Sequence, residues 1–521
     1  MTRQESTPSR RRALQWSAAG LAAAVPGAWA QAAAPAMRPL QIVGPWELTG
    51  LAPANSGYMF ARLQIAETLM NAADDGTPQP GLAQRWRLSA DGLAWRFELR
   101  PGARFHDGTA VTTDAVLRCL AVARKPPSLL SVAPIAAMEA EGSRTVLIRL
   151  EAPFGGLPSL LAHSSTIILA PSSYRPDGGV QRIVGTGPFR IAVLSPPQLV
   201  EAVAFEGYDG PQPAIRHTRY LTVSRAETRA LMIEAGQADL AYSLDPASLQ
   251  RLRTRRQVPI ESATLPRTVI VKLNAGLPAL KDVRVRRALS LSIDRAGIAK
   301  ALLRDPSLAA TQMFPPTMTG WHDPTLPALR HDPGEAERLL AEAGWQRTGE
   351  GLRGPDGQPM KLVLRGFPDR PELPIFATAL QEQWRQAGIA VRVSIGNSGD
   401  IPLGHRDGTL DMGLGARNFG TVPDPTGTLL QDYGAQGGDW GAMGWKHDGV
   451  VAALAELSRG GVPAERAATL RAGIVRVLQE ELPVIPVTWY RQHVAMSPRV
   501  ARVSVDPLER SYRISGMEWK A

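Results

Sequence analysis

The sequence holds one cysteine in 521 residues, Cys119. A single thiol excludes an intramolecular disulfide and any metal site built from several thiolates. Cys119 falls on the apolar face of a helical pattern, so we expect it to be a buried core residue and not a nucleophile. Long apolar runs are also missing after the N-terminal region, where no 18 consecutive residues are uncharged and apolar. We therefore expect no membrane-spanning helix in that part of the chain.

Clustered positive charge is lacking as well, although the formal net charge is +10. Only seven of the 58 basic residues are lysines, and the arginines are scattered along the chain without basic blocks. This distribution argues against a nucleic-acid partner. Hydrophobic residues make up 44% and charged residues 20%, which excludes wholesale disorder, collagen and coiled coil. At roughly 150 residues per domain, the length allows two to four domains.

The N-terminus has the three parts of an export signal. Arg10, Arg11 and Arg12 precede an apolar run over residues 16–25, and Ala28-Trp29-Ala30 forms a small-x-small cleavage site. The apolar run is shorter than the roughly 20 residues that a membrane span needs. The paired arginines predict the twin-arginine (Tat) route, with the Sec route as the alternative. We predict cleavage after Ala30.

Helical patterns followed by strand patterns recur through the rest of the chain. Asp332 and Pro333 start a helix that ends at Gly344, and residues 375–387 form another helix followed by an alternating strand over 389–395. Residues 228–235 and 239–242 repeat this order of helix and strand, and residues 282–293 add a further helix. This alternation predicts an α/β protein. In the first third, alternating strands such as 95–99 and 145–150 predict a mixed α+β insert.

Motifs of catalysis and of cofactor binding are missing. The sequence has no G-x-S-x-G, no H-E-x-x-H, and no pair among its eight histidines at i,i+3 or i,i+4. The run Gly185-Thr186-Gly187-Pro188 lacks the further residues of a phosphate-binding loop, so we interpret it as a turn before a strand. Phe105-His106-Asp107-Gly108 likewise predicts a turn. We expect no enzyme, no bound cofactor and no direct metal site, with a secreted hydrolase as the remote alternative.

Six blocks of sequence stand out in order along the chain, at residues 81–109, 184–189, 283–295, 332–345, 380–389 and 481–486. Together they resemble one family: the extracytoplasmic solute-binding proteins, family 5, which serve dipeptide, oligopeptide and nickel ATP-binding cassette importers. The resemblance spans essentially the whole chain after the signal.

The resemblance implies a two-lobe α/β periplasmic binding protein fold of type II, cluster C-like, with an additional α+β subdomain on lobe one. The strands that cross between the lobes are expected near residues 269–273 and 484–489. The expected division is a signal peptide over 1–30, lobe I over 31–65, 185–270 and 484–521, the inserted subdomain over 66–184, and lobe II over 271–483.

The resemblance also implies a function. The protein would be the periplasmic substrate-binding component of an ATP-binding cassette importer, a monomer that captures a small solute in the cleft by hinge closure and presents it to a membrane permease. A peptide or a similar carboxylate-bearing solute is the expected ligand. The alternatives are a nickel or metallophore-binding protein of the same family and a periplasmic partner of a sensor.

Three segments of the sequence correspond to stretches that line the pocket in this family. The expected ligand-binding residues are Tyr58, Met59, Phe60, Arg417, Asn418, Phe419, Gly420 and Tyr512. Arg417 is the strongest candidate, because a guanidinium can pair in bidentate fashion with a ligand carboxylate. Two departures weaken the nickel alternative: Ala416 stands where the nickel-binding branch has a histidine, and Ser164, beside His163, stands where it has a carboxylate-clamping arginine.

Overall fold

The computed structural model describes residues 38–125, 128–255, 257–349, 351–367, 372–435 and 437–520. The predicted signal peptide and its cleavage site lie outside these residues, so they stay predictions. Every element below belongs to one compact unit, Pro39–Ala521.

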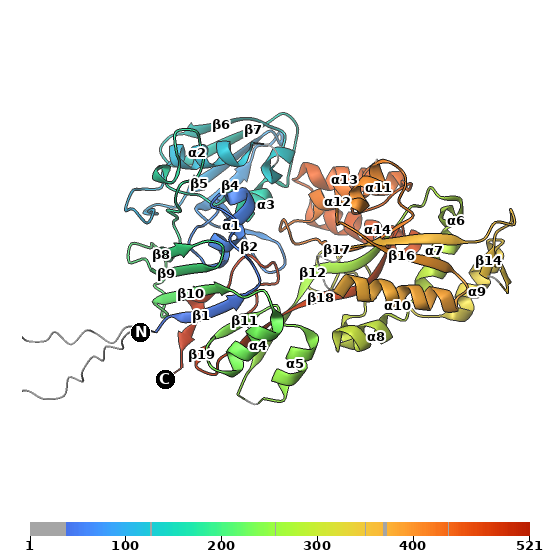
Figure 1. The fold of residues 1–521 in the computed structure, drawn as a ribbon. Helices are drawn as coiled ribbons and strands as arrows, with labels where there is room; N and C mark the ends of the chain where they lie inside the picture. The colour runs from blue at the N-terminus through green and yellow to red at the C-terminus, as the bar shows by residue number, and fades with distance from the viewer. Residues whose placement is uncertain are drawn as a thin grey trace, which may run out of the picture. The chain divides into compact units, whose positions relative to one another are not determined.

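A ten-stranded mixed sheet runs through this unit (Figure 1). In spatial order its strands are β16 (Ala390–Ile395), β15 (Lys361–Gly366), β17 (Met412–Asn418), β12 (Ile260–Leu273), β18 (Val484–Met496), β11 (Leu240–Tyr242), β1 (Leu40–Gly44), β10 (His217–Thr222), β9 (Leu199–Ala204) and β8 (Phe189–Ser195). We call the side from β11 to β8 lobe I and the side from β17 to β16 lobe II.

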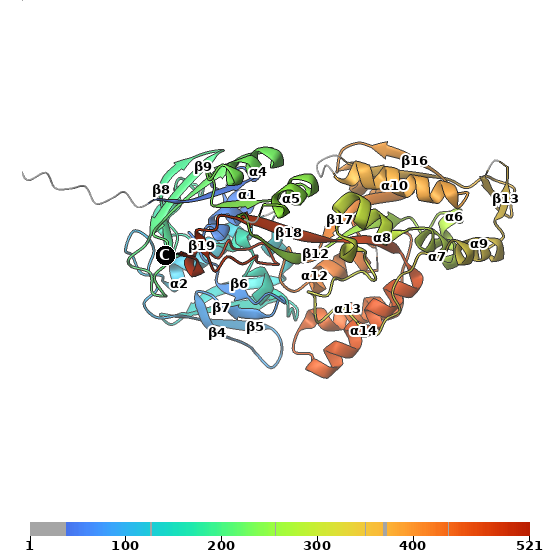
Figure 2. The same ribbon diagram turned by 90° about the horizontal axis from the view of Figure 1, so that it is seen from below.

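The two longest strands, β12 and β18, connect these lobes (Figure 2). They pair antiparallel from Ile260↔Ala495 to Lys272↔Val484, with register shifts between Leu265 and Thr268 and between Val269 and Ile270. β12 also pairs with β17 of lobe II, and β18 also pairs with β11 of lobe I. The predicted crossover segments lie within these two strands.

A second sheet stands apart in the first third of the chain. Its order is β4 (Ala83–Leu88), β5 (Ala94–Leu99), β7 (Thr145–Leu150) and β6 (Ile135–Glu141), all antiparallel. Helix α2 (Thr113–Ala123) packs on it, and Thr112 caps this helix by accepting a hydrogen bond from the Ala115 amide. The buried Trp95, Phe97 and Leu99 alternate with half-buried residues, which is the period of two expected of a strand. This sheet is the α+β insert that the sequence predicts.

Cys119 is buried in α2, as predicted, where it contacts the backbone of Leu169 and the hydroxyl of Tyr174. Burial raises the pKa of its thiol, which keeps the sulfur protonated and unreactive.

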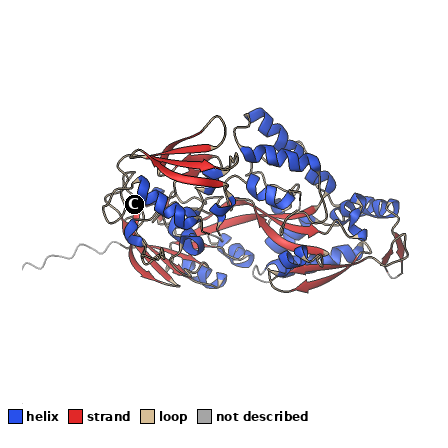
Figure 3. Ribbon diagram, turned by 90° about the horizontal axis from the view of Figure 1, so that it is seen from above, coloured by secondary structure: helices blue, strands red, loops and turns tan. Residues whose placement is uncertain are grey.

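The remaining elements cover the sheets (Figure 3). The helices of lobe I are α1 (Pro53–Arg62), α3 (Leu157–Leu160), α4 (Ala226–Glu234) and α5 (Pro246–Arg253). Those of lobe II are α6 (Pro278–Lys281), α7 (Val283–Leu291), α8 (Arg295–Ile298), α9 (Pro333–Glu342), α10 (Glu372–Gln386), α11 (Asp400–Arg406), α12 (Thr426–Tyr433), α13 (Asp448–Arg459) and α14 (Ala464–Glu481). Short pairs join β2 (Met70–Ala72) with β3 (Pro78–Pro80), β13 (Gln346–Thr348) with β14 (Gly351–Arg353), and β19 (Val500–Ala501) with β20 (Glu518–Trp519).

The helix boundaries follow from local chemistry. Asp332 caps α9 by accepting a hydrogen bond from the Glu335 amide at 3.0 Å, and Gly344 follows its end with φ +87°. α10 buries Leu380 and Trp384 completely and is followed by Gly388 with φ +81°. Both helices were predicted from sequence and are confirmed, with α10 starting three residues earlier than expected.

The Gly-rich segment at residues 185–188 is a close backbone contact and not a phosphate-binding loop. The Gly187 amide donates a hydrogen bond to the Ile65 carbonyl at 3.0 Å. A Cβ at Gly185 would overlap the carbonyl oxygen of Ile65, and one at Gly187 would overlap that of Gln64. β8 begins directly afterwards at Phe189. The structural interpretation of this motif is confirmed, because its glycines are required by the chain that follows α1.

Candidate ligand-binding cleft

A cavity of about 1720 Å³ lies where the two lobes and the crossover strands meet. Its walls include Tyr58 and Leu244 of lobe I, Phe367 and Trp440 of lobe II, and Tyr490 of β18. Pockets for drug-sized molecules are typically about 300–1,000 Å³. This cleft is therefore large enough for a ligand of several residues.

On the lobe I side, aromatic rings hold an arginine. The guanidinium carbon of Arg62 lies 4.2 Å from the ring centroid of Trp46 and 5.2 Å from that of Tyr58. The hydroxyl of Tyr58 donates a hydrogen bond to the Glu47 carbonyl at 2.8 Å. Because Tyr58 and Arg62 are four residues apart on α1, they share one face of that helix. Both residues line the cavity.

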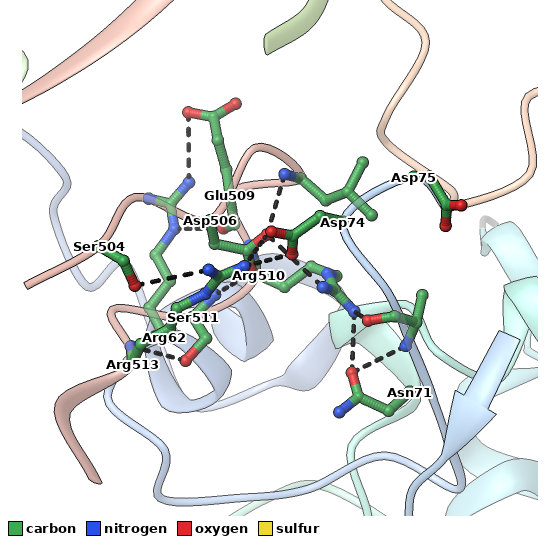
Figure 4. A network of polar contacts seen from close by, with 12 residues as sticks. Arg62, Asn71, Asp74, Asp75, Ser504, Asp506, Glu509, Arg510, Ser511 and Arg513 are labelled. Atoms are coloured by element: carbon green, nitrogen blue, oxygen red, sulfur yellow. Dashed lines mark hydrogen bonds and ion pairs between the residues drawn. The ribbon is translucent and has the colours of Figure 1, made fainter. Parts of the chain in front are cut away.

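The C-terminal segment over residues 504–513 contributes side chains to this part of the cavity wall. Polar contacts hold the segment in place (Figure 4). Asp506, whose side chain is 2% exposed, accepts hydrogen bonds from the amides of Leu508 (2.9 Å), Arg510 (3.2 Å) and Ser511 (3.1 Å). Arg510 donates to the carbonyl of Ala72 at 2.7 Å, and Arg513 pairs with Asp74. These contacts fix the segment to the chain that follows α1.

On the lobe II side, Arg417 is already paired. Its Nε and Nη2 donate to Oδ2 and Oδ1 of Asp432 at 2.6 and 2.9 Å. Asp432 lies in α12 and its side chain is 2% exposed, whereas that of Arg417 is 18% exposed. Burial raises the pKa of Asp432, and the Arg417 guanidinium opposes that rise. Arg417 lines the cavity, but its bidentate partner is this internal carboxylate.

The next three residues have different surroundings. Asn418 and Gly420 line the cavity, and Oδ1 of Asn418 accepts a hydrogen bond from the Gly420 amide at 2.9 Å. Phe419 points away, is 1% exposed and packs edge-on against Phe314 with ring centroids 5.0 Å apart. The structure therefore brings Asn418 and Gly420 to the cleft and places Phe419 in the core.

Three other predicted ligand residues are core residues. Met59 and Phe60 have no exposed surface, belong to the main core of lobe I and are absent from the cavity wall. Tyr512 is 3% exposed and lies behind the wall, with its ring centroid 4.5 Å from that of Tyr242 and 6.3 Å from that of Trp46. These three side chains have almost no accessible surface. They therefore support the wall of the cleft and do not contact the solute.

A buried lysine supports the lobe II wall. Nζ of Lys272 donates to the carbonyls of Gly438 and Gly441 at 2.5 and 2.8 Å, and lies 2.9 Å from Nδ1 of His405. Burial lowers its pKa to about 7, although the nearby acidic groups Asp432 and Asp439 oppose this effect. The contacts fix the backbone on both sides of Trp440.

Two histidines line the cleft, His163 and His493. Burial lowers the pKa of each to about 4, so both are neutral near neutral pH. Nδ1 of His163 accepts a hydrogen bond from the Ser165 amide at 3.1 Å. Among the residues described, no three His, Cys, Asp or Glu side chains gather closely enough to hold a metal ion. Nor does any helix in that part of the chain have the length and apolar character to cross a membrane.

Sequence reasoning missed four cleft residues that the structure brings together: Trp46, Arg62, Arg267 and Glu509. The i,i+4 spacing of Tyr58 and Arg62 could have indicated Arg62, because it places both residues on one face of a helix. Nothing in the sequence indicated that Arg267 and Glu509, 242 positions apart, form an ion pair at 2.7 Å.

Two α/β lobes, two paired crossover strands and a cavity walled by both lobes define the class of two-lobe solute-binding proteins. The solved structure of NikA from Brucella suis in complex with Fe(III)-EDTA has this fold, with a TM-score of 0.83 at 23% identity over 93% of this chain and all of that one.

The chain belongs to the bacterial extracellular solute-binding proteins, family 5, whose model matches residues 77–440. It is 26% identical to the nickel-binding periplasmic protein of Escherichia coli K12, over 89% of this chain and 93% of that protein. It is also 26% identical to the probable di/tripeptide-binding protein 5 of Pseudomonas aeruginosa, over 67% of this chain and 70% of that protein.

Proposed function

We propose that this protein captures a small solute in the cleft and delivers it to the membrane permease of an ATP-binding cassette importer. The expected ligand is a peptide or a similar carboxylate-bearing molecule. Membership in family 5 supports binding without chemical turnover, and the periplasmic relative from E. coli supports a periplasmic location. The arginine pair near the N-terminus supports export through the Tat route with cleavage after Ala30, and the mature protein is proposed to act as a monomer.

The observation that carries this proposal is the composition of the cavity wall. Trp46 and Arg62 belong to lobe I, Trp440 and Asn418 to lobe II, and Arg267 to a crossover strand. A solute in this cavity touches both lobes at once. It therefore binds more tightly when the lobes approach, and that difference in affinity shifts the protein towards a closed form that a permease can recognise.

The arginines of the wall offer limited support for a carboxylate-bearing solute. Its arginines are Arg62, Arg229, Arg267, Arg417, Arg491, Arg510 and Arg513. Most of their nitrogens serve internal partners, as Arg229 does by donating to four backbone carbonyls. The acidic residues of the wall are Glu67, Asp74, Asp245, Glu372, Asp506 and Glu509. The seven arginines exceed them by one, a formal positive charge that favours an anion only weakly.

A thermal-unfolding panel tests the proposal. Dipeptides, tripeptides, glutathione and their C-terminal amides are each added to the mature protein, and a true ligand raises the unfolding midpoint. At a ligand concentration of 100 Kd, the stabilisation is about 2.7 kcal/mol. We expect free-acid peptides to stabilise the protein more than their amides. Equal effects of acid and amide would contradict the carboxylate preference, and no stabilisation by any peptide would contradict the peptide class.

A nickel chelate is the second candidate. The 26% identity to the nickel-binding protein covers most of both chains, and the neutral imidazoles of His163 and His493 line the cleft. Nickel chloride, L-histidine and a mixture of the two therefore belong in the same panel. Stabilisation by the nickel–histidine mixture, and by neither component separately, would favour this candidate over a peptide.

A further inference from the structure

Arg62 is held in place by contacts other than a hydrogen-bonded carboxylate. Its faces lie on Trp46 and Tyr58, and its Nε donates to the backbone carbonyl of Glu509 at 2.9 Å. Nη2 is 3.9 Å from Oε1 of Glu509, which is beyond hydrogen-bond distance. Nη1 is buried and has no hydrogen-bond partner among the residues described, and the Arg62 side chain also contacts Tyr512. A fixed guanidinium whose nearest carboxylate is this distant is suited to bind an anion through Nη2.

Arg267 approaches the same place from the crossover strand. It follows Pro266 at the register shift of β12, and its backbone is paired with Asn418 of β17. Its guanidinium carbon lies 5.3 Å from the ring centroid of Tyr490, and its Nη2 donates to Oε2 of Glu509 at 2.7 Å. Arg62 of lobe I and Arg267 of the crossover strand β12 therefore both lie next to the carboxylate of Glu509.

Glu509 supplies that carboxylate from a turn whose backbone is fixed independently of its side chain. Its φ is +56°, and its amide donates to the Asp506 carbonyl at 3.0 Å. Figure 4 shows the surrounding contacts that tie this turn to the chain after α1. Because the backbone carbonyl of Glu509 holds Nε of Arg62, the side chain can swing away while Arg62 keeps its position.

The single carboxylate of Glu509 does not neutralise both the Arg62 and the Arg267 guanidinium. Two guanidiniums share its single carboxylate, and the nearby carboxylates Asp74 and Asp506 are engaged by Arg510 and Arg513. The side chains of Arg62, Arg267 and Glu509 are 11%, 10% and 17% exposed, and all three line the cavity. A second anion would therefore meet a positively charged and largely dehydrated site, where an ion pair is strong.

We propose that Arg62 and Arg267 form a carboxylate-binding subsite, which the side chain of Glu509 fills in the unliganded protein and which a ligand carboxylate takes over. The inference rests on the proposed function, solute binding in this cleft. Glu509 then acts as a built-in competitor. It keeps two buried cations paired while the cleft is empty, and it lowers the apparent affinity for carboxylates.

Succinate and its neutral counterpart succinamide test the subsite without knowledge of the natural solute. Binding of each to the mature protein is measured by saturation-transfer NMR titration for the wild type and for Glu509→Gln, which keeps an oxygen for Arg267 but removes the competing charge. If Glu509 fills the subsite about nine-tenths of the time, the apparent Kd for succinate should fall about tenfold in the variant. The affinity for succinamide should not change.

Two further variants make the result specific. Arg62→Met in the Glu509→Gln background keeps the packing on Trp46 and should abolish the gain for succinate. If it does not fold, as judged by circular dichroism, Arg267→Met in the same background takes its place. Asp305→Asn is the matched control, because Asp305 pairs with Arg491, another arginine of the cavity wall, at 2.5 Å. Like Glu509→Gln, this control removes one negative charge, but it should leave succinate affinity unchanged.

Unchanged or weaker succinate binding by Glu509→Gln would overturn the subsite, as would an equal gain in Asp305→Asn or an equal gain for succinamide. Absence of succinate binding to Glu509→Gln would also overturn it. These outcomes are separable from failure of the proposed function. If no peptide of the thermal-unfolding panel binds, the succinate titration can still support the subsite. If a peptide does bind, the titration can still contradict the subsite.

Discussion

At the scale of single residues, the partner of an arginine decides whether its charge recognises a solute or holds the fold. Arg417 and Arg62 both line the cleft. Arg417 is paired in bidentate fashion with the buried Asp432. Among the residues described, Arg62 donates Nε to a backbone carbonyl and lies 3.9 Å from its nearest carboxylate, that of Glu509. The sequence singled out Arg417 because it lies in a segment that resembles a binding loop. Asp432 is 15 positions away in another element, and sequence reasoning had no means to pair them.

Removing Arg417 should therefore destabilise the empty protein. Arg417→Ala leaves the Asp432 carboxylate buried and unpaired, which typically costs about 3–5 kcal/mol. Adding Asp432→Ala should recover part of this loss, because the two residues are directly coupled. Urea unfolding of the two single variants and the double variant measures the coupling.

The matched control is Arg385→Ala, which breaks an exposed i,i+3 pair with Glu382 on α10 and should barely change stability. Normal stability of Arg417→Ala together with lost solute binding would contradict this account, and would return Arg417 to the role of a ligand residue.

At the scale of elements, close backbone approach explains the glycines between the insert and lobe I. Gly187 packs directly on the chain that follows α1, and its amide is bonded to Ile65. Its φ is not positive, so the requirement for glycine is space and not backbone conformation. The segment therefore fixes the place where α1, and with it Tyr58 and Arg62, meets the start of β8.

Gly187→Ala should lower the free energy of unfolding by about 1–3 kcal/mol, because backbone must shift to admit the methyl group. Gly473→Ala is the opposite case. Gly473 is exposed in α14, and no neighbouring atom lies within 4 Å of the position that an alanine methyl group would take. Alanine there should stabilise the protein by about 0.4–1 kcal/mol. Thermal unfolding of both variants checks the contrast, and equal effects would contradict the packing explanation.

Elements with a local signal were predictable, and long-range pairings were not. The cap at Asp332 and the apolar face of residues 375–387 predicted α9 and α10 closely. Met59 and Phe60 show the limit, because the same segment carries Tyr58 on the cavity wall and these two residues in the core. Which face of α1 meets the cleft depends on Trp46 and on the C-terminal segment, neither of which is local to that helix.

At the scale of the whole molecule, the cleft belongs to neither lobe by itself. Arg267 lies on β12, where its backbone pairs with Asn418 of β17 and the pairing with β18 shifts register. Its partner Glu509 lies near the C-terminus. A solute that contacts this place and lobe II at once gains contacts when the lobes approach. Capture is then a shift between open and closed forms, whose size is set by the difference in affinity between them.

The central claim is that the protein binds its solute by closure and returns it unchanged. Small-angle X-ray scattering of the mature protein, with and without a saturating panel compound that raises the unfolding midpoint, tests it most directly, with mass spectrometry of the compound recovered from the same sample. We predict a smaller radius of gyration with solute and a compound of unaltered mass. An unchanged radius at saturation, or a chemically altered compound, would contradict it.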